Sequence, residues 1–357
     1  MANKPLRTSD FDYVLDETLI AQGPSQRRDQ SRLMVLHRST GRREHRVFAD
    51  LPCLLRPGDL LVLNDTRVIP ARFSCRRSSG GRVEGLFCRQ VEPGKWDVLL
   101  KSAGRCKPSE VLTFQGSDRL SLRLDESLGQ GRWMVSLQPP EPAETVLQAV
   151  GTTPLPPYIR RRDSGSEEID RLRYQTVYAT KPGAVAAPTA GMHFTEELLA
   201  ALRQAGIRTT RVTLHVGSGT FLPVTVEDLA HHKMHPEWYE LSEDAADELN
   251  AARRDRRRIV AVGTTSVRVL ETAAAVSRPF SPVNGWTDLF IHPPAEFLAV
   301  DAMITNFHLP RSTLLVLVAA FCRPGGTEGI GTILDAYAEA ARLRYRFYSY
   351  GDAMLIL

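Results

Sequence analysis

The chain has 357 residues, of which 43% are hydrophobic and 24% charged, a globular composition with room for about two domains. The formal net charge of +4 fits a local basic patch for a polyanion but does not require one. The five cysteines are odd in number and form no C-x-x-C pair, which argues against a disulfide scaffold or a zinc ribbon and indicates a reducing compartment.

The sequence gives no signal for a membrane. The N-terminus is polar, so we expect no signal peptide, and the longest apolar run, Leu314 to Cys322, is far shorter than the roughly 20 residues that span a bilayer. We therefore expect a cytoplasmic protein without a membrane partner. Arginines are bunched at 160–162, 253–258 and 342–346. Each bunch could contact phosphates, although a solvated face is the favoured interpretation for any one of them.

In chain order, the first clear element is a buried strand over 59–63, entered from a Pro-Gly turn. From about 73 to 153, helical periodicity is nearly absent and turn signals separate short apolar stretches, which predict strands at 83–88, 96–100, 111–114, 120–124 and 133–137. Strands this short at this spacing favour a small β-barrel or sandwich.

After the stiff segment Pro154 to Pro157, strands and helices alternate. Helices are predicted over 195–202, with Thr195 as N-cap and Gly206 as the stop, over 242–253 and from about 266, and strands over 211–216 and 258–262. A further helical face near the C-terminus comprises Leu334, Tyr337, Ala341 and Tyr345. This alternation indicates an α/β domain with a largely parallel sheet. We expect an α/β catalytic domain, residues 1–73 plus 153–357, interrupted by an all-β barrel insert, residues 74–152.

Two polar segments are candidate ligand loops. In 64–72, Asn64 and Asp65 could bind ribose hydroxyls, and Arg67 and Arg72 could bind phosphate or carboxylate, but an Asx-turn held by an internal Asp–Arg pair explains them equally well. In 186–195, small residues permit close approach, and His193 lies just before a predicted helix. The positive end of a helix dipole lowers histidine pKa and suits a general base, although a lone histidine is more often structural.

Two further loops combine glycine with hydroxyls after a predicted strand. The segment 215–221, with His215, Gly217 and Gly219, lacks both the P-loop ending and the dinucleotide fingerprint. It fits a loop around an adenosine or a carboxylate, and the alternative is a tight turn. The segment 263–268, with Thr264, Thr265 and Arg268, offers free amides at a helix start for a phosphate or an amino-acid carboxylate. The alternative is an N-cap with surplus hydroxyls.

Two clusters contain histidine. In 232–237, His232, His235 and Glu237 lie at i, i+3 and i+5 with Pro236 between them, which meets no standard ligand spacing. We expect no metal there, and a polar catalytic or RNA-contacting loop instead. In 305–310, Asn306 offers an amide, Phe307 a stacking ring and His308 an imidazole, a combination that suits an unstacked nucleotide.

These segments carry a resemblance. The chain resembles the S-adenosylmethionine:tRNA ribosyltransferase-isomerase family of the queuosine pathway nearly end to end. The matching stretches are 28–32, 58–72, 154–159, 174–179, 186–195, 215–221, 305–310 and 345–354. One stretch departs from the family pattern: Pro293-Pro294-Ala295-Glu296-Phe297 stands where Pro-Gly-Tyr-x-Phe is usual. If that tyrosine stacks on a ligand, affinity here is lower or supplied from elsewhere.

The resemblance implies a fold and a reaction. The family fold is an α/β domain with a small β-barrel, and its members move the ribosyl part of S-adenosylmethionine onto a 7-aminomethyl-7-deazaguanine at the tRNA wobble position. The group becomes an epoxycyclopentanediol, and adenine and methionine leave. The partners are therefore tRNA and S-adenosylmethionine as co-substrate, with no metal or redox cofactor, and we expect a monomer.

That chemistry requires a base for a hydrogen next to the sulfonium, a proton for departing adenine and a neutral attacking amine. The candidates for proton transfer are His193, which we prefer, His215, His235 and His308, with Asp65 and Glu237 as orienters. Arg67, Thr264, Thr265 and Arg268 are candidates to hold the methionine carboxylate or tRNA phosphates. The other candidate binding residues are Asn64, Arg72, Thr189, Gly217, Gly219, Asn306, Phe307 and Asp352.

Two rival functions remain. A common S-adenosylmethionine-dependent RNA methyltransferase would release S-adenosylhomocysteine, but the G-x-G-x-G loop of that fold is missing. A non-catalytic RNA-binding protein would bind tRNA without consuming S-adenosylmethionine.

Overall fold

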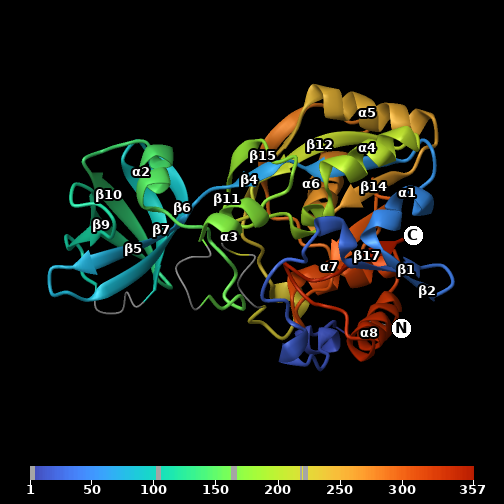
Figure 1. Ribbon diagram of the computed structural model, residues 1–357, viewed down its shortest axis with the longest axis horizontal. Coiled ribbons are helices and arrows are strands. Elements are labelled where there is room, and N and C mark those ends of the chain that lie inside the picture. The colour runs from blue at the N-terminus through green and yellow to red at the C-terminus, as the bar shows by residue number, and fades with distance from the viewer. Residues whose placement is uncertain (1–4, 102–105, 162–166, 218, 220–223) are drawn as a thin grey trace.

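The computed structural model describes residues 5–101, 106–161, 167–217, 219 and 224–357. Figure 1 shows two bodies side by side, a β-barrel on the left and a sheet between helices on the right. This arrangement confirms the predicted α/β domain with a small all-β barrel. In the part of the chain just defined, no helix is both long and apolar enough to cross a lipid bilayer.

The large sheet has nine strands in the order β15-β13-β12-β3-β14-β16-β17-β1-β2. Their bounds are β1 Arg32–His37, β2 Arg42–Val47, β3 Leu60–Asn64, β12 Arg208–Leu214, β13 Glu237–Leu241, β14 Ile259–Val262, β15 Val283–Thr287, β16 Ala302–Asn306 and β17 Ala353–Ile356. Strand β4 (Thr66–Val68) pairs separately with β11 (Lys181–Ala184).

The expectation of a largely parallel sheet was wrong. The central strands β12, β3, β14 and β16 are parallel, and so is the pair β1–β17. The pairs β16–β17, β1–β2, β12–β13 and β13–β15 are antiparallel, so the sheet is mixed. The alternation of strands and helices identifies the type of each element, whereas the direction of a strand is set by its connection, which leaves no periodic signal.

Both faces of the sheet are covered by helices, which explains why β14 is apolar at every position and β3 at every position before Asn64. Val62 of β3 belongs to an apolar cluster that includes side chains of α5 (Glu243–Arg254), α6 (Thr264–Val276), α7 (Thr313–Cys322) and α8 (Gly329–Arg342). The preceding residue, Leu61, points the other way and belongs to a second cluster, with side chains of α1 (Leu51–Leu54) and α4 (Glu196–Gln204). Burial of each large apolar side chain of this kind contributes about 1.5–3 kcal/mol.

The barrel closes through six antiparallel strands in the order β10-β7-β6-β5-β8-β9. They are β5 Arg72–Arg77, β6 Arg82–Glu92, β7 Lys95–Lys101, β8 Val111–Phe114, β9 Ser121–Gly129 and β10 Arg132–Gln138. Phe73 packs edge-on against Phe114 with the ring centroids 5.3 Å apart, and a Cβ on Gly85 would lie 2.2 Å from the Phe73 ring. Only glycine therefore fits at position 85 in β6.

Helix α2 (Ala143–Val150) was not predicted, because 73–153 gave almost no helical periodicity. It places Val146 and Leu147 against the barrel core, and two adjacent apolar residues in two turns form too short a pattern to identify a helix. Helix α3 (Glu167–Arg173) follows.

Barrel strand β5 begins at Arg72, which also bridges to Thr152. The domain limits 1–73, 74–152 and 153–357 stay a prediction.

The predicted cap of α4 is confirmed. Thr195 has extended backbone angles, and its hydroxyl oxygen accepts a hydrogen bond from the backbone N–H of Leu198 at 3.1 Å. Gly206 follows the helix with φ of +78°, as expected of a stop.

Replacing Thr195 by Ala should lower the free energy of unfolding by about 1 kcal/mol, because one amide of the first turn loses its acceptor. Urea unfolding followed by circular dichroism measures the difference. Thr195→Ser keeps the hydroxyl and serves as the matched control. Equal stability of the alanine variant and the wild type would show that this cap contributes nothing.

Candidate active site

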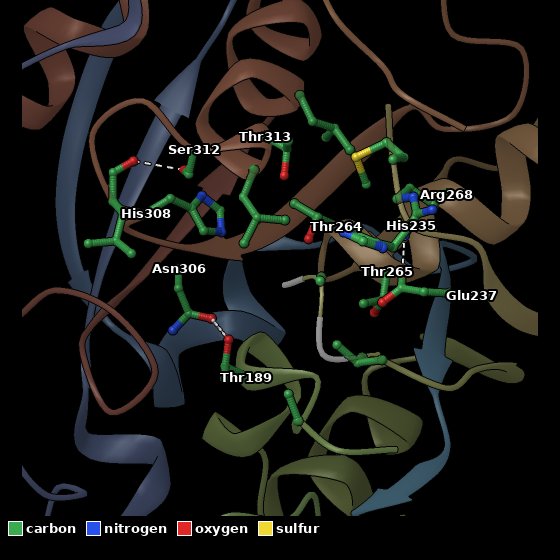
Figure 2. A pocket seen from close by; sticks show the side chains of 18 of the residues that line it. Thr189, His235, Glu237, Thr264, Thr265, Arg268, Asn306, His308, Ser312 and Thr313 are labelled. Atoms are coloured by element: carbon green, nitrogen blue, oxygen red, sulfur yellow. Dashed lines mark hydrogen bonds and ion pairs between the residues drawn. The ribbon is translucent and has the colours of Figure 1, made fainter. Parts of the chain in front are cut away.

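A cavity of about 860 Å³ opens where β14 and β16 end, beside the 3-10 helix Thr189–His193. Figure 2 shows polar side chains from four segments pointing into it. Ten candidate residues line this cavity: Thr189, Gly219, His235, Glu237, Thr264, Thr265, Arg268, Asn306, Phe307 and His308. A site at the carboxyl ends of parallel strands is expected for an α/β sheet.

The N-terminus of α6 forms one wall of the cavity. The helix begins at Thr264, two residues earlier than predicted, and Gly263 turns the chain with φ of +87° and no side-chain cap. The Thr265 hydroxyl is buried and finds no hydrogen-bond partner among the described residues. Ser266 is unavailable, because its hydroxyl donates to the carbonyl of Val262 at 2.8 Å. Unpaired amides and hydroxyls at a helix start suit an anion or another acceptor.

Arg268 and Glu237 form a buried ion pair beside this wall, and each side chain is 6% exposed. Arg268 also donates to the carbonyls of Thr287 and Leu289, both at 3.1 Å. Glu237 accepts from the backbone N–H of Gly217 at 2.7 Å. The Arg268 charge is therefore compensated within the protein, so this residue shapes the wall and fixes β13 to α6.

Asn306, the last residue of β16, is buried and bonds in several directions. Its Oδ1 accepts from the Thr189 hydroxyl at 2.8 Å, as Figure 2 shows. Its Nδ2 lies 3.3 Å from Nε2 of His193 and 3.5 Å from the carbonyl oxygens of both Tyr348 and Asp352. One amide thus joins three segments that lie far apart in the sequence.

Four histidines line the cavity, His231, His232, His235 and His308, and the last two are candidates from the sequence. The His308 ring is buried, and burial, which disfavours the imidazolium, lowers its pKa to about 3. Its nearest polar neighbours are the hydroxyls of Thr305 and Tyr337, each at 3.4 Å. His235 is exposed and packs against Gly219, where a Cβ would approach the ring to 2.7 Å. Glycine at 219 therefore allows His235 to lie over the cavity.

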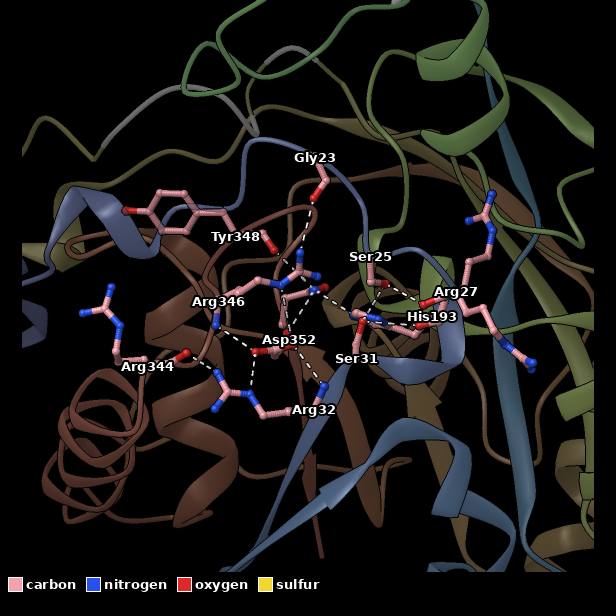
Figure 3. Close-up of polar contacts among 12 residues, drawn as sticks. Gly23, Ser25, Arg27, Ser31, Arg32, His193, Arg344, Arg346, Tyr348 and Asp352 are labelled. Atoms are coloured by element: carbon pink, nitrogen blue, oxygen red, sulfur yellow. Dashed lines mark hydrogen bonds and ion pairs between the residues drawn. The ribbon is translucent and has the colours of Figure 1, made fainter.

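The preferred base, His193, lies behind the cavity wall rather than in it. Its ring packs 5.0 Å from that of Phe48 and lines a small depression with Arg28 and Ser349. Burial is the main cause that lowers its pKa to about 3, followed by the positive charge of Arg346. Figure 3 shows His193 among the polar contacts around Asp352 and Arg346. Its expected position just ahead of α4 is correct, but the ring does not line the cavity.

Asn64 and Asp65 are engaged within the fold, outside the cavity. The Asn64 amide bonds the backbone N–H and carbonyl of Leu214, both at 3.1 Å. Asp65 accepts from the hydroxyls of Thr213 at 2.7 Å and Thr180 at 2.9 Å. Both side chains join β3 to neighbouring segments.

The other candidates also lie away from the cavity. His215 bonds Thr66 at 2.8 Å and stacks on Trp238, and burial lowers its pKa. Arg72 donates to the Leu155 carbonyl at 2.9 Å, and Arg67 is exposed. Asp352 accepts from the backbone N–H groups of Arg32 at 3.0 Å and Arg346 at 2.8 Å. None of these four candidates lines the cavity, and the same holds for Asn64, Asp65, His193 and Gly217. Ser218, Thr220 and Phe221 of the segment 215–221, and Arg162, lie outside the described residues.

The Phe307 ring is not placed for stacking. It is fully buried, with centroids 5.3 Å from Tyr337 and 5.1 Å from Phe347. The other aromatic residues that line the cavity include Tyr158 and Tyr348, whose rings lie 4.7 Å apart. Sequence analysis missed both, although each belongs to a stretch that matches the family.

Ser312 and Thr313 were also missed. Ser312 caps α7 by accepting from the backbone N–H of Leu315 at 3.2 Å. The sequence did contain a signal for this cap, because a serine stands directly before an apolar run and just after the segment 305–310. Pro294 and Ala295, which depart from the family pattern, do not line the cavity.

No group of three or more His, Cys, Asp or Glu side chains that could hold a metal occurs in the portion of the chain that is described.

The fold and the cavity define an α/β protein with a site large enough for a small molecule. The model of the family described as queuosine biosynthesis protein matches residues 8–356. A protein of Anaeromyxobacter sp. (strain K) named S-adenosylmethionine:tRNA ribosyltransferase-isomerase is 54% identical over 361 residues, 99% of each chain. One of the same name from Symbiobacterium thermophilum is 49% identical over 353 residues, 99% of this chain and 100% of the other.

A solved structure is similar over nearly the whole length. The crystal structure of S-adenosylmethionine tRNA ribosyltransferase from Thermotoga maritima matches with a TM-score of 0.55 and 38% identity, covering 98% of this chain and 100% of that one. The chain therefore belongs to the queuosine biosynthesis protein family.

The two buried histidines should stay neutral at physiological pH. We expect the ring signals of His193 and His308 in long-range proton–nitrogen spectra, assigned with single His→Gln variants, to show no titration between pH 5 and 8. Their folded-state pKa of about 3 lies below the ordinary 6.5, so the unfolded state binds more protons below pH 6.5. Their contribution to stability should decline as the pH falls from about 6.5 towards 3. A midpoint near 6.5 for either ring would contradict the burial described.

Proposed function

We propose that this protein transfers the ribosyl group of S-adenosylmethionine to the 7-aminomethyl-7-deazaguanine at the wobble position of tRNA and isomerises it. The product is epoxyqueuosine-tRNA, and adenine and methionine are released. The observation that carries the proposal is the match along nearly the whole chain to relatives with this name, at up to 54% identity. A cavity of about 860 Å³ with polar groups on several sides supports it, because both the nucleoside and the methionyl part of S-adenosylmethionine need anchors.

We assign the methionine carboxylate to the start of α6. The free amides there, with the hydroxyls of Thr264 and Thr265, form an environment that favours negative charge. Arg268 backs this wall, but its charge is already paired with Glu237. The carboxylate would therefore be held mainly by hydrogen bonds from the helix end.

Proton transfer is assigned to two of the histidines that line the cavity, His308 and His235. A base must remove a proton from the ribose C5′ next to the sulfonium, and adenine must receive one as it leaves. His308 is neutral and buried, so one nitrogen of its ring is free of a proton and shielded from water. His235, at the exposed side, is placed to exchange protons with solvent. These assignments replace His193 and leave Asp65 and His215 without a part in the chemistry.

The tRNA would meet the cavity from outside. Within 253–258, Arg253, Arg257 and Arg258 pair with Asp301, Asp255 and Asp59, so this bunch mainly serves the fold. Arg342 and Arg344 are exposed, and no side-chain hydrogen bond or ion pair within 4 Å is described for either, although Arg344 is near enough to Asp16 to help lower the pKa of that carboxyl. We assign phosphate contacts to these two arginines. The barrel would help to grip the anticodon arm. We further propose a cytoplasmic monomer that needs no metal or cofactor, with S-adenosylmethionine as co-substrate.

The reaction is tested with purified protein, S-adenosylmethionine and tRNA that carries the aminomethyl base. Adenine and methionine should appear in equal amounts by liquid chromatography and mass spectrometry, and the tRNA should gain a ribosyl-derived mass. Unmodified tRNA is the control and should release neither product. Release of S-adenosylhomocysteine would instead mean a methyltransferase, and tRNA binding with no release would mean a binding protein.

A further inference from the structure

The orientation of the Asn306 side chain is set by its neighbours. One end of its amide lies 3.5 Å from two backbone carbonyl oxygens, those of Tyr348 and Asp352. Carbonyl oxygens only accept hydrogen bonds, so the group that faces them must be the NH₂. The other end, Oδ1, is thereby directed to the Thr189 hydroxyl at 2.8 Å.

This orientation fixes the proton on His193. Its Nε2 lies 3.3 Å from the same NH₂ group and must therefore accept, which requires an unprotonated Nε2. A bond with the backbone of Arg28 favours the charged form of the ring, as expected when the other ring nitrogen donates to a carbonyl. The neutral ring with its proton on Nδ1 satisfies both contacts.

The Thr189 hydroxyl is the end of this chain of bonds. Since its proton is donated to Asn306, its oxygen can offer only lone pairs to the cavity, into which Thr189 projects in Figure 2. Thr189 is only partly buried, so a ligand can reach it. The substrate atom opposite must be a donor, which means a hydroxyl or an amino group.

We propose that His193 is a positioning residue that acts through Asn306 to make the Thr189 oxygen a hydrogen-bond acceptor for a hydroxyl or amino group of the substrate. The inference rests on the proposed function, whose donors are the ribose hydroxyls and amino groups of S-adenosylmethionine and the aminomethyl group of the tRNA. A direct role of His193 as base is disfavoured by its place: the lone pair of Nε2 is engaged by Asn306, and the ring lies outside the cavity.

The test compares two replacements of His193. Gln can place a carbonyl oxygen near the position of Nε2, whereas Phe keeps the ring shape without an acceptor. We expect His193→Phe to lower kcat by on the order of ten- to a hundredfold, since the Asn306 donor loses its partner, and His193→Gln to stay within about threefold of the wild type. His37→Phe, at a partly exposed histidine that bonds Glu44, is the matched control and should leave kcat unchanged.

Thr189→Val tests the other end of the hydrogen-bond network that runs from His193 through Asn306. This test does not depend on whether His193→Phe folds. It should lower kcat as much as His193→Phe does, and the double variant should be no worse than either, because both act through one network. A rise in KM for S-adenosylmethionine would assign the donor to that substrate, and a rise in KM for tRNA would assign it to the aminomethyl group. The kcat against pH profile of His193→Gln should keep the wild-type shape.

Three results would overturn the inference. The first is full activity of His193→Phe or of Thr189→Val, and the second is additive losses of kcat in the double variant. The third is loss of the acidic limb of the pH profile in His193→Gln, which would make His193 the base. Circular dichroism melting of each variant confirms that the fold is retained. If the wild type itself releases no adenine, the proposed function fails instead, so the two failures are distinguishable.

Discussion

The site depends on one buried amide at the end of a strand. Asn306 is 2% exposed, and a polar group this deeply buried is costly unless its hydrogen bonds are made. Its partners are Thr189, His193 and the carbonyls of Tyr348 and Asp352, so this one amide connects three segments that lie far apart in the sequence. Asp352 continues the network by accepting from the backbone of Arg32 and Arg346.

The sheet supplies the frame on which this network acts. Adjacent parallel strands β14 and β16 end at the same edge, so the start of α6 and the segment after Asn306 face each other across the cavity. Helices cover both faces of the sheet, which keeps those strand ends fixed. Catalysis by orientation requires this rigidity, because small errors in position lower the rate steeply. The polar groups are therefore arranged before any ligand arrives, which limits the entropy lost on binding.

Much of the fold follows from local patterns, because caps, turns and alternation are written in neighbouring residues. Thr195 as the cap of α4 and the strands of the barrel are examples. Strand direction and the short helix α2 have no such signature. The sequence could predict that the site lies at the ends of strands, but not which side chains there face the cavity. Asn64 ends strand β3 just as Asn306 ends β16, yet the amide of Asn64 is turned to Leu214. Thr189 and His193 share one short helix, but only Thr189 reaches the cavity.

The most direct measurement is a crystal structure of the protein with S-adenosylmethionine bound. The ligand should lie in the cavity between the start of α6 and Asn306, with its carboxylate near Thr264 and a hydroxyl or amino group within hydrogen-bond distance of the Thr189 oxygen, unless the tRNA supplies that donor. His193 should not touch it. Ligand in the depression beside Arg28 and His193, or between the barrel and the sheet, would contradict this account of the site.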